Sequence, residues 1–253
     1  MKRAWRVARS LLLWIASGLH FFTLCTLLVA LGIVVDPRRN DWPQRVLFRN
    51  VLRVAGVKFQ VRRAPGFDAT RTSLFIANHV NLFDAFVVYS AIPQFLRGLE
   101  LESHFKIPAY GWMMRRFGNI PVRKNPTASQ TKELYRRTRE ALDDGVSLVV
   151  FPEGGRTLDG HVHEFKDGAF RMAVQFGYPV VPMAITGSFE FNRKGSWMLN
   201  PSTIVVYLEP AIETKGLTKQ DVGKLRDRVH EIVSARVDAA MAERQGRNSD
   251  ATA

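Results

Sequence analysis

The sequence predicts an α/β protein in which helices flank a central sheet, preceded by an N-terminal helical segment that associates with a membrane. Short runs rich in β-favouring residues alternate with longer amphipathic runs, which is typical of an α/β layer. Polar residues follow directly after several of the short runs. The stretch from Leu11 to Val35 contains twenty-five residues without Asp, Glu, Lys or Arg. A chain of 253 residues has room for one such domain and a short appendage.

The net charge of +13 is concentrated at the N-terminal end. Residues 1–63 hold twelve Lys or Arg against two Asp, a net of +10. Cations beside an apolar stretch favour an anionic membrane surface over nucleic acid, so we expect membrane lipids and no nucleic acid as partners. Cys25 is the single cysteine and lies within the apolar stretch, which excludes an intramolecular disulfide and fits the cytoplasmic side of a membrane.

The apolar stretch is long enough to cross a bilayer. As a helix it measures roughly 37 Å, against a hydrocarbon core of about 30 Å. It is too long for the apolar run of a cleaved signal peptide. Polar residues such as Ser17 and His20 leave a helix lying in the interface as an alternative. Because basic residues flank it on both sides, a helix that re-enters or lies flat fits better than a simple span.

A second amphipathic helix is expected from Trp42 to Ala55. Arg45, Arg49 and Arg53 recur at every fourth position, and a separate apolar stripe runs from Leu47 to Ala55. We interpret it as a helix on the membrane surface. The alternative is that its apolar stripe packs on the following domain.

The remaining elements follow from periodicity, capping residues and glycine stops. Thr127 with Gln130 and Thr218 with Asp221 have the spacing of capping boxes. The segment 96–105 shows no clear pattern. We expect strands over residues 56–61, 72–77, 120–122, 146–151, 180–185 and 203–208, and helices over 82–92, 110–117, 127–143, 168–176 and 218–244.

A histidine and an aspartate follow the strand expected at 72–77. His79 lies at the strand exit, Asn81 caps the next helix, and Asp84 falls in its first turn. A carboxylate there can bind one ring nitrogen and leave the other basic, so that His79 can take a proton from an alcohol. The alternative is that Asp84 completes a capping box and His79 is an ordinary loop histidine.

Two further strand exits carry residues suited to an anion. In an open sheet, exits on the same edge converge on one crevice, where Arg123 and Arg156 suit a phosphate. Gly154 allows close approach of the backbone, and Glu153 suits a polyol hydroxyl or an arginine. Each alone is also compatible with a purely structural role.

Four residues of the segment 159–164 have side chains that could bind a metal ion: Asp159, His161, His163 and Glu164. Their spacing matches no familiar site, so we expect no metal.

Four blocks appear in the order found in glycerolipid acyltransferases: residues 79–84 (HVNLFD), 118–123 (GNIPVR), 151–156 (FPEGGR) and 181–185 (VPMAI). The chain resembles the 1-acylglycerol-3-phosphate O-acyltransferases (lysophosphatidic acid acyltransferases) of that group over residues 58–215, and FKDGAF at 165–170 is also similar. The resemblance implies a mixed central sheet flanked by helices. Composition and charge, taken together with it, predict a membrane location on the cytoplasmic face and three segments. These are membrane-binding helices at 1–57, the acyltransferase domain at 58–245 and a disordered tail at 246–253.

The resemblance also implies the reaction and its residues. An acyl group passes from acyl-CoA or acyl carrier protein, as co-substrate, to the free hydroxyl of 1-acylglycerol-3-phosphate, giving phosphatidic acid. No cofactor is implied. His79 is the general base and Asp84 its orienting partner. The acyl acceptor and its phosphate are bound by Arg123, Glu153, Gly154 and Arg156.

Two departures from the family pattern keep other functions open. Gly155 stands where the family has Thr or Ser, and the tract from Leu99 to His104 is less basic than usual. The alternatives are another lyso-lipid acceptor (a lyso-ornithine lipid or a lysophospholipid), a thioesterase-like hydrolase in which His79 activates water, and a non-catalytic basic binder. No Gly-x-Ser-x-Gly elbow occurs, which disfavours a covalent acyl-enzyme. Backbone N–H groups near Leu82 are expected to bind the oxyanion.

Overall fold

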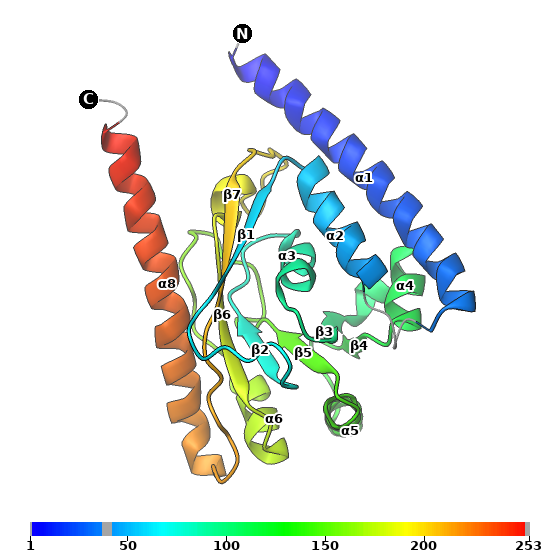
Figure 1. The fold of residues 1–253 in the computed structure, drawn as a ribbon, viewed down its shortest axis with the longest axis vertical. Coiled ribbons are helices and arrows are strands. Elements are labelled where there is room, and N and C mark those ends of the chain that lie inside the picture. Colours follow the sequence, from blue (N-terminus) through cyan, green and yellow to red (C-terminus); the bar gives the residue numbers. More distant parts are fainter. Residues whose placement is uncertain (1, 37–41, 251–253) are drawn as a thin grey trace.

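The computed structural model describes residues 2–36 and 42–250 (Figure 1). The helices are α1 (Lys2–Val34), α2 (Trp42–Val54), α3 (Asp84–Ala91), α4 (Tyr110–Arg116), α5 (Ala128–Asp143), α6 (Gly168–Phe176), α7 (Ser188–Phe191) and α8 (Val222–Asp250), with 3-10 turns η1 (Glu102–Lys106) and η2 (Lys219–Asp221). The strands are β1 (Lys58–Arg63), β2 (Leu74–Ala77), β3 (Leu96–Leu101), β4 (Ile120–Val122), β5 (Ser147–Val150), β6 (Val180–Thr186) and β7 (Thr203–Leu208).

The strands form one mixed sheet in the order β1-β7-β6-β2-β5-β3-β4. Neighbouring strands run parallel except β6 and β7, which confirms the expected mixed α/β architecture. The central strand β2 is buried along its whole length, which explains its continuous apolar run. Because β2, β5, β3 and β4 are parallel, their carboxyl ends lie at the same edge of the sheet.

Helices cover both faces of the sheet (Figure 1). Phe75 and Ala77 of β2 point into the core formed with α1, α2, α3 and α4. Leu74 and Ile76, on the other side of the same strand, point into the core formed with α5, α6 and α8. Because alternate side chains of this short strand point to opposite faces of the sheet, β2 contributes to the core beneath both helical layers.

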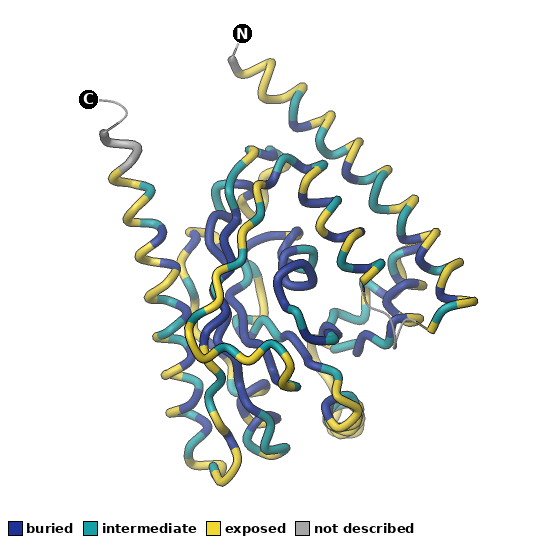
Figure 2. Tube along the Cα trace, viewed as in Figure 1, coloured by how far each residue is buried: buried dark blue, intermediate teal, exposed yellow. Residues whose placement is uncertain are grey.

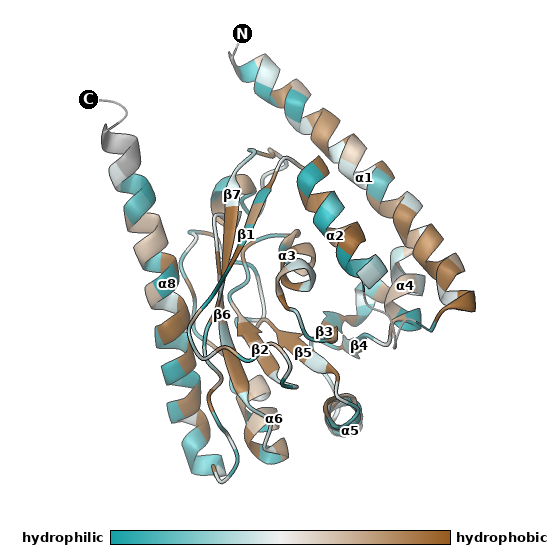
Figure 3. Cartoon of the chain, viewed as in Figure 1, coloured by the Kyte–Doolittle hydropathy of each residue, from teal (hydrophilic) through white to brown (hydrophobic). Residues whose placement is uncertain are grey.

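The apolar stretch lies within one unbroken helix, α1. Arg3–Val34 is long and apolar enough to cross a membrane. The helix packs on α2 and α4, with Cys25 and Leu28 buried, while its outer face exposes leucines such as Leu12 and Leu19 (Figures 2 and 3). A re-entrant path is thus contradicted by the unbroken helix. Arg38 and Arg39, part of its expected basic flank, lie outside the described residues.

The apolar stripe of α2 takes the alternative position, against the domain, while Trp42 and Val46 of the same helix stay exposed; a role at the membrane surface stays a prediction. Its apolar stripe, including Phe48 and Leu52, is buried against the domain. Arg45 donates hydrogen bonds to the backbone oxygens of Ile92 and Gln94, just after the end of α3. Arg49 Nη2 donates to the carbonyl of Ser90 at 3.1 Å, in the last turn of α3, where helical carbonyls lack partners. Two of the spaced arginines therefore bind backbone oxygens at and beyond the end of α3.

Most predicted elements are confirmed within two residues, and three differences stand out. The strand β3 was not predicted because a buried arginine, Arg97, and a glycine, Gly98, are atypical of a strand. In the structure the Arg97 guanidinium lies over the Phe95 ring, 4.1 Å from its centroid, and the Gly98 N–H donates to Tyr89 Oη at 2.9 Å. The short α7 was also missed. Helix α8 continues to Asp250, past the expected end at 244 and into the segment 246–253 expected to be disordered; residues 251–253 lie outside the described residues.

Candidate active site

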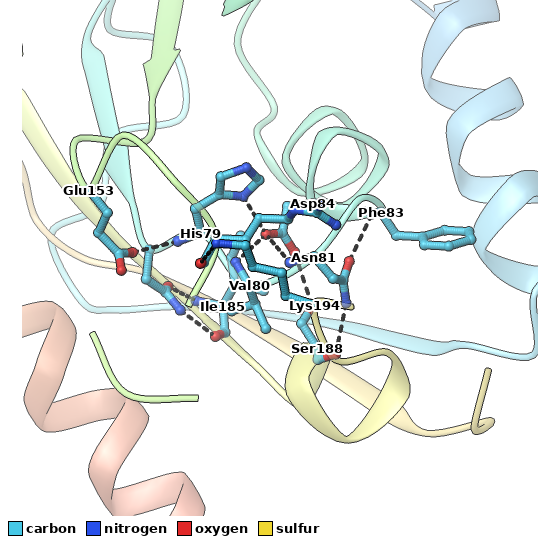
Figure 4. A network of polar contacts seen from close by, with 11 residues as sticks. His79, Val80, Asn81, Phe83, Asp84, Glu153, Ile185, Ser188 and Lys194 are labelled. Atoms are coloured by element: carbon cyan, nitrogen blue, oxygen red, sulfur yellow. Dashed lines mark hydrogen bonds and ion pairs between the residues drawn. The ribbon is translucent and has the colours of Figure 1, made fainter. Parts of the chain in front are cut away.

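His79 lies two residues after the last residue of the central strand, where the turn after the neighbouring strand holds its backbone. Its N–H donates to Glu153 Oε1 at 2.7 Å (Figure 4), and its carbonyl accepts from Thr157 N at 2.9 Å. Glu153 and Thr157 belong to the turn that follows β5, the strand adjacent to β2. The two strand exits are therefore joined at the histidine.

A buried aspartate orients the imidazole. His79 Nδ1 lies 2.8 Å from Asp84 Oδ2, and the same oxygen accepts from the N–H groups of Val80 (2.6 Å) and Asn81 (2.9 Å). The other oxygen accepts from Ser188 Oγ at 3.2 Å. An ionised carboxylate only accepts, so Nδ1 carries a proton and Nε2 presents its lone pair.

The second ring nitrogen of His79 is open to a substrate. Phe151 stacks on the imidazole with centroids 4.4 Å apart, which fixes the ring plane. The side chain is 26% exposed, and Nε2 has no hydrogen-bond partner among the described residues. The histidine is thus rigidly held on one side and accessible on the other.

Only half of the alternative capping box is present. Asp84 accepts from the Asn81 N–H, but Asn81 Oδ1 accepts from Phe83 N at 2.7 Å instead of from Asp84 N. The helix α3 begins at Asp84, two residues later than predicted, and the residue before it, Phe83, provides no side-chain cap. One carboxylate therefore closes the turn and orients the imidazole.

Two asparagines and a serine were missed as site residues. Asn78 Nδ2 donates to the Ile185 carbonyl (3.0 Å) and Asn78 Oδ1 accepts from Ile185 N (2.7 Å), which continues the pairing of β2 with β6. Asn81 Nδ2 donates to the Ser188 carbonyl at 2.7 Å (Figure 4). Polar residues on both sides of His79 were the available signal, but their partners lie more than a hundred residues away in the chain.

Glu153 braces the turn on which it lies. Its Oε1 accepts from His79 N and its Oε2 from His163 N at 3.1 Å. Burial raises the pKa of this carboxyl, and the two backbone N–H groups partly offset that effect. Both oxygens therefore have partners within the protein.

The neighbouring Gly154 allows a lysine to approach the turn. Its φ is +69°, and a Cβ built there would lie 2.6 Å from Lys166 Nζ. A Cβ built on Gly155 would meet nothing within 4 Å. The position of Gly154 is thus crowded, whereas that of Gly155 faces open space.

The guanidinium of Arg156 forms no hydrogen bond or ion pair with the described residues. Only its backbone carbonyl is bound, by Lys194 Nζ at 3.0 Å. The turn after β5 accordingly presents a free cation close to His79.

Arg123 lies apart from this group. It follows β4, and β3 and β5 lie between β4 and β2, a lateral separation of roughly 14 Å at about 4.8 Å per strand. Its Nη2 is 2.6 Å from Glu102 Oε1, at the rim of a groove of about 1100 Å³ beside β4. The structure therefore joins His79 to Asp84 and to the turn that carries Glu153 and Arg156, whereas Arg123 follows a strand three positions away from β2 in the sheet.

The two histidines considered as metal ligands, His161 and His163, each contact a different aspartate. His161 Nδ1 is 3.0 Å from Asp238 Oδ1, and His163 Nε2 is 3.2 Å from Asp159 Oδ1. Among residues 2–36 and 42–250, no three His, Cys, Asp or Glu side chains are grouped to hold a metal ion.

Comparison with known proteins identifies the class. The family model named Acyltransferase matches residues 58–186, about half of the chain, and the chain belongs to this family.

Particular relatives carry a more specific name. A 1-acyl-sn-glycerol-3-phosphate acyltransferase of Limnanthes douglasii is 27% identical over 183 residues, covering 72% of this chain and 64% of the relative. A protein of the same name from Pseudomonas aeruginosa is 25% identical and covers 72% and 69% of the two chains. The chain thus spans less than two thirds of the length of the first of these relatives. A crystal structure of the 1-acyl-sn-glycerophosphate (LPA) acyltransferase PlsC from Thermotoga maritima shares the fold, with a TM-score of 0.78, 22% identity and coverage of 96% and 98%.

Proposed function

We propose that this protein transfers a fatty acyl group from acyl-CoA or acyl carrier protein to the free hydroxyl of 1-acylglycerol-3-phosphate, giving phosphatidic acid. The observation that carries the proposal is the His79–Asp84 pair, with Nε2 open at a strand exit next to the turn that carries Arg156. The names of the relatives support the choice of acceptor.

The reaction needs one base and no enzyme nucleophile. His79 Nε2 takes the proton of the acceptor hydroxyl while its oxygen forms a bond to the thioester carbonyl carbon. The tetrahedral intermediate collapses, the C–S bond breaks, and the imidazolium returns its proton to the thiolate. Asp84 stabilises the imidazolium through Nδ1.

The turn between His79 and α3 limits which amides can bind the oxyanion. The N–H groups of Val80 and Asn81 bind Asp84, and that of Phe83 binds Asn81. Among the described residues the Leu82 N–H has no acceptor, so we assign the oxyanion to it.

Arg156 is the principal ligand that we assign to the acceptor phosphate. Gly154 lets the phosphate approach the turn, and Glu153 acts by holding that turn to His79. Arg123 uses one guanidinium nitrogen to bind Glu102, and its other N–H groups remain available to the phosphate. We place the reaction at the cytoplasmic face of a membrane, supported by the exposed leucines of α1.

The test is thiol release in detergent with acyl-CoA and 1-acylglycerol-3-phosphate. His79→Ala should lower kcat by about 10²- to 10⁴-fold, the usual contribution of a general base. Wild-type rates in the variant would rule out His79 as the base. Thiol and free fatty acid released at the same rate without any acceptor would indicate a thioesterase instead.

A second acceptor is favoured by one observation. The open space at Gly155 lacks the hydroxyl that the family pattern has there. A panel of acceptors that includes a lyso-ornithine lipid and lysophospholipids decides between them: the phosphate monoester should have the highest kcat/KM, and a higher value for a lipid without it would replace our assignment.

A further inference from the structure

The loop over residues 192–200, which leads from α7 to β7, contacts the turn that carries Arg156. Lys194 Nζ donates to the carbonyl oxygen of Arg156 at 3.0 Å, and Lys194 belongs to the network of polar contacts drawn in Figure 4. The next residue of the turn, Thr157, donates its N–H to the carbonyl of His79 at 2.9 Å. The lysine therefore binds the turn one residue away from its contact with the proposed base.

The same loop is bound by the N-terminal helix α1. Trp14 Nε1 donates to the carbonyl of Trp197 at 2.6 Å. One helical turn earlier, the buried hydroxyl of Ser10 accepts from the N–H of the buried Leu199 at 3.1 Å. The ring of Trp14 also packs on Phe83, just before α3, with centroids 5.6 Å apart. The helix α1 thus holds one end of a loop whose other end holds the turn after β5.

Hydrogen bonds within the loop keep these two attachments in a fixed relation. The buried side chain of Asn192 donates through Nδ2 to the carbonyls of Ser196 at 2.9 Å and Met198 at 3.1 Å. The N–H of Asn200 donates to the carbonyl of Phe191 at 2.9 Å, which closes the loop at its base. Loops whose ends meet and whose interior is filled by their own side chains are compact units. A displacement at α1 is therefore passed on to Lys194.

The position of Arg156 depends on its backbone. Its guanidinium forms no hydrogen bond or ion pair within residues 2–36 and 42–250, so the side chain has no brace of its own there. Lys194 is exposed, and an exposed hydrogen bond adds little to the stability of a fold. Small misplacements of a binding group are costly to a reaction. The contact with Lys194 therefore matters more for where Arg156 lies than for folding.

We propose that Lys194 is a positioning residue for the acyl transfer proposed above, on which this inference rests. It fixes the turn after β5 so that Arg156 meets the phosphate of the acceptor, and the loop 192–200 makes this position depend on α1. Lys194 touches neither the substrates nor the reacting atoms. Because Asp84 orients the imidazole of His79 independently, the effect falls on acceptor binding and leaves proton transfer intact.

Thiol-release kinetics in detergent tests the role of Lys194. Lys194→Met should raise KM for 1-acylglycerol-3-phosphate about three- to tenfold, as expected when a hydrogen bond from a charged donor is lost, and leave kcat and KM for the thioester nearly unchanged. Lys194→Arg keeps a cationic donor and should restore acceptor binding. Lys132→Met, which removes an exposed lysine of α5, is the matched control and should resemble the wild type. An unchanged acceptor KM in Lys194→Met, or an equal rise of both KM values, would overturn the proposal.

A double-mutant cycle tests the connection to α1. Trp14→Phe keeps a ring against Phe83 and removes the N–H donor, so it should raise the acceptor KM about two- to fivefold. The double variant with Lys194→Met should be no worse than Lys194→Met alone, because both changes break one chain of contacts. Ser10→Ala, which cuts the other attachment of the loop, should act like Trp14→Phe. Effects that multiply would show that Lys194 acts through its charge alone and would overturn the connection.

Hydrogen exchange separates this inference from the proposed reaction. In full-length protein in detergent, the amide of the buried Thr157 should exchange faster in Lys194→Met and in Trp14→Phe than in the wild type, and Lys132→Met should not change it. If the wild type acylates 1-acylglycerol-3-phosphate and neither this exchange nor the acceptor KM changes, the role of Lys194 is wrong and the reaction stands. If the wild type does not acylate it, the reaction is wrong; faster exchange then still supports Lys194 as the residue that fixes the turn, and unchanged exchange overturns both.

Discussion

The carboxylate of Asp84 shows how one side chain decides the chemistry of another. It is fully buried and takes hydrogen bonds from the imidazole, two backbone N–H groups and a hydroxyl. These donors hold the carboxylate in a single orientation, and this orientation sets the tautomer of His79. The imidazole is thus oriented, with Nε2 open at the edge of the sheet.

Asp84→Asn should lower kcat by about 10²- to 10⁴-fold with little change in either KM. An amide can present its NH2 group to Nδ1, which moves the ring proton to Nε2 and removes the base. Thiol-release kinetics measures the effect. Ser188→Ala removes a single donor from the same carboxylate, and we expect a loss of about tenfold or less. Equal losses in the two variants would show that Asp84 acts only through the structure of the turn.

The adjacent glycines of the turn after β5 should tolerate a methyl group very differently. Gly154→Ala combines a left-handed backbone with a contact to Lys166, and should lower the free energy of unfolding by about 1–2 kcal/mol. Gly155→Ala enters open space and should change it by less than about 0.5 kcal/mol. Urea denaturation of both variants in detergent measures the difference, and equal effects would contradict the geometry of this turn.

At the scale of elements, α2 shows how one pattern serves two environments. Arginines at every fourth position beside an apolar stripe suit a membrane surface, yet here the stripe faces a protein core and Arg45 binds carbonyls just beyond the end of α3. The local sequence is the same in both cases. The difference lies in which surface is available to bury the stripe.

Arg45→Ala should therefore destabilise the fold, whereas Arg53→Ala should not. Arg45 loses hydrogen bonds to two carbonyls, worth about 2 kcal/mol together. Arg53 bonds only Asn50 within its own exposed helix surface, so we expect a change within about 0.5 kcal/mol. Thermal unfolding measures both. If instead the two variants keep wild-type stability and lose vesicle binding equally, α2 acts at the membrane after all.

At the scale of the whole molecule, the N-terminal helices share a core with the sheet. Cys25 and Leu28 of α1 and Leu47 of α2 belong to the same buried cluster as Phe75 of β2. Removing residues 1–57 would open this cluster and unfold the domain. A test of membrane binding must therefore leave the inner face of α1 intact.

Replacing Leu12, Leu19 and Ile33 by serine should release the protein from vesicles without unfolding it. These side chains are 62%, 67% and 80% exposed, so they add little to the core, while each contributes apolar area to a membrane contact. Co-sedimentation with anionic vesicles measures binding, and far-ultraviolet circular dichroism checks the fold. Unchanged sedimentation of the folded variant would count against α1 as the membrane anchor.

Local pattern alone determined most of the elements and the contact between His79 and Asp84. Capping boxes at Thr127 and Thr218, glycine stops and apolar runs predicted most helices and strands, and the spacing of His79 and Asp84 predicted their contact. Such features depend on neighbours within a few residues, where the geometry of the chain allows few choices. Among the helices and strands of the described residues, β3 and α7 were not predicted, because their residues lack a local pattern.

Tertiary structure alone decided the partners of these elements. It turned the stripe of α2 inward, tied Asn78 and Asn81 to segments beyond residue 184, and placed Arg123 beside Glu102, at the end of a strand three positions away from β2 in the sheet. The order of strands in the sheet sets all of these contacts. That order depends on which buried faces pack together across the chain, a choice that no short stretch of residues contains.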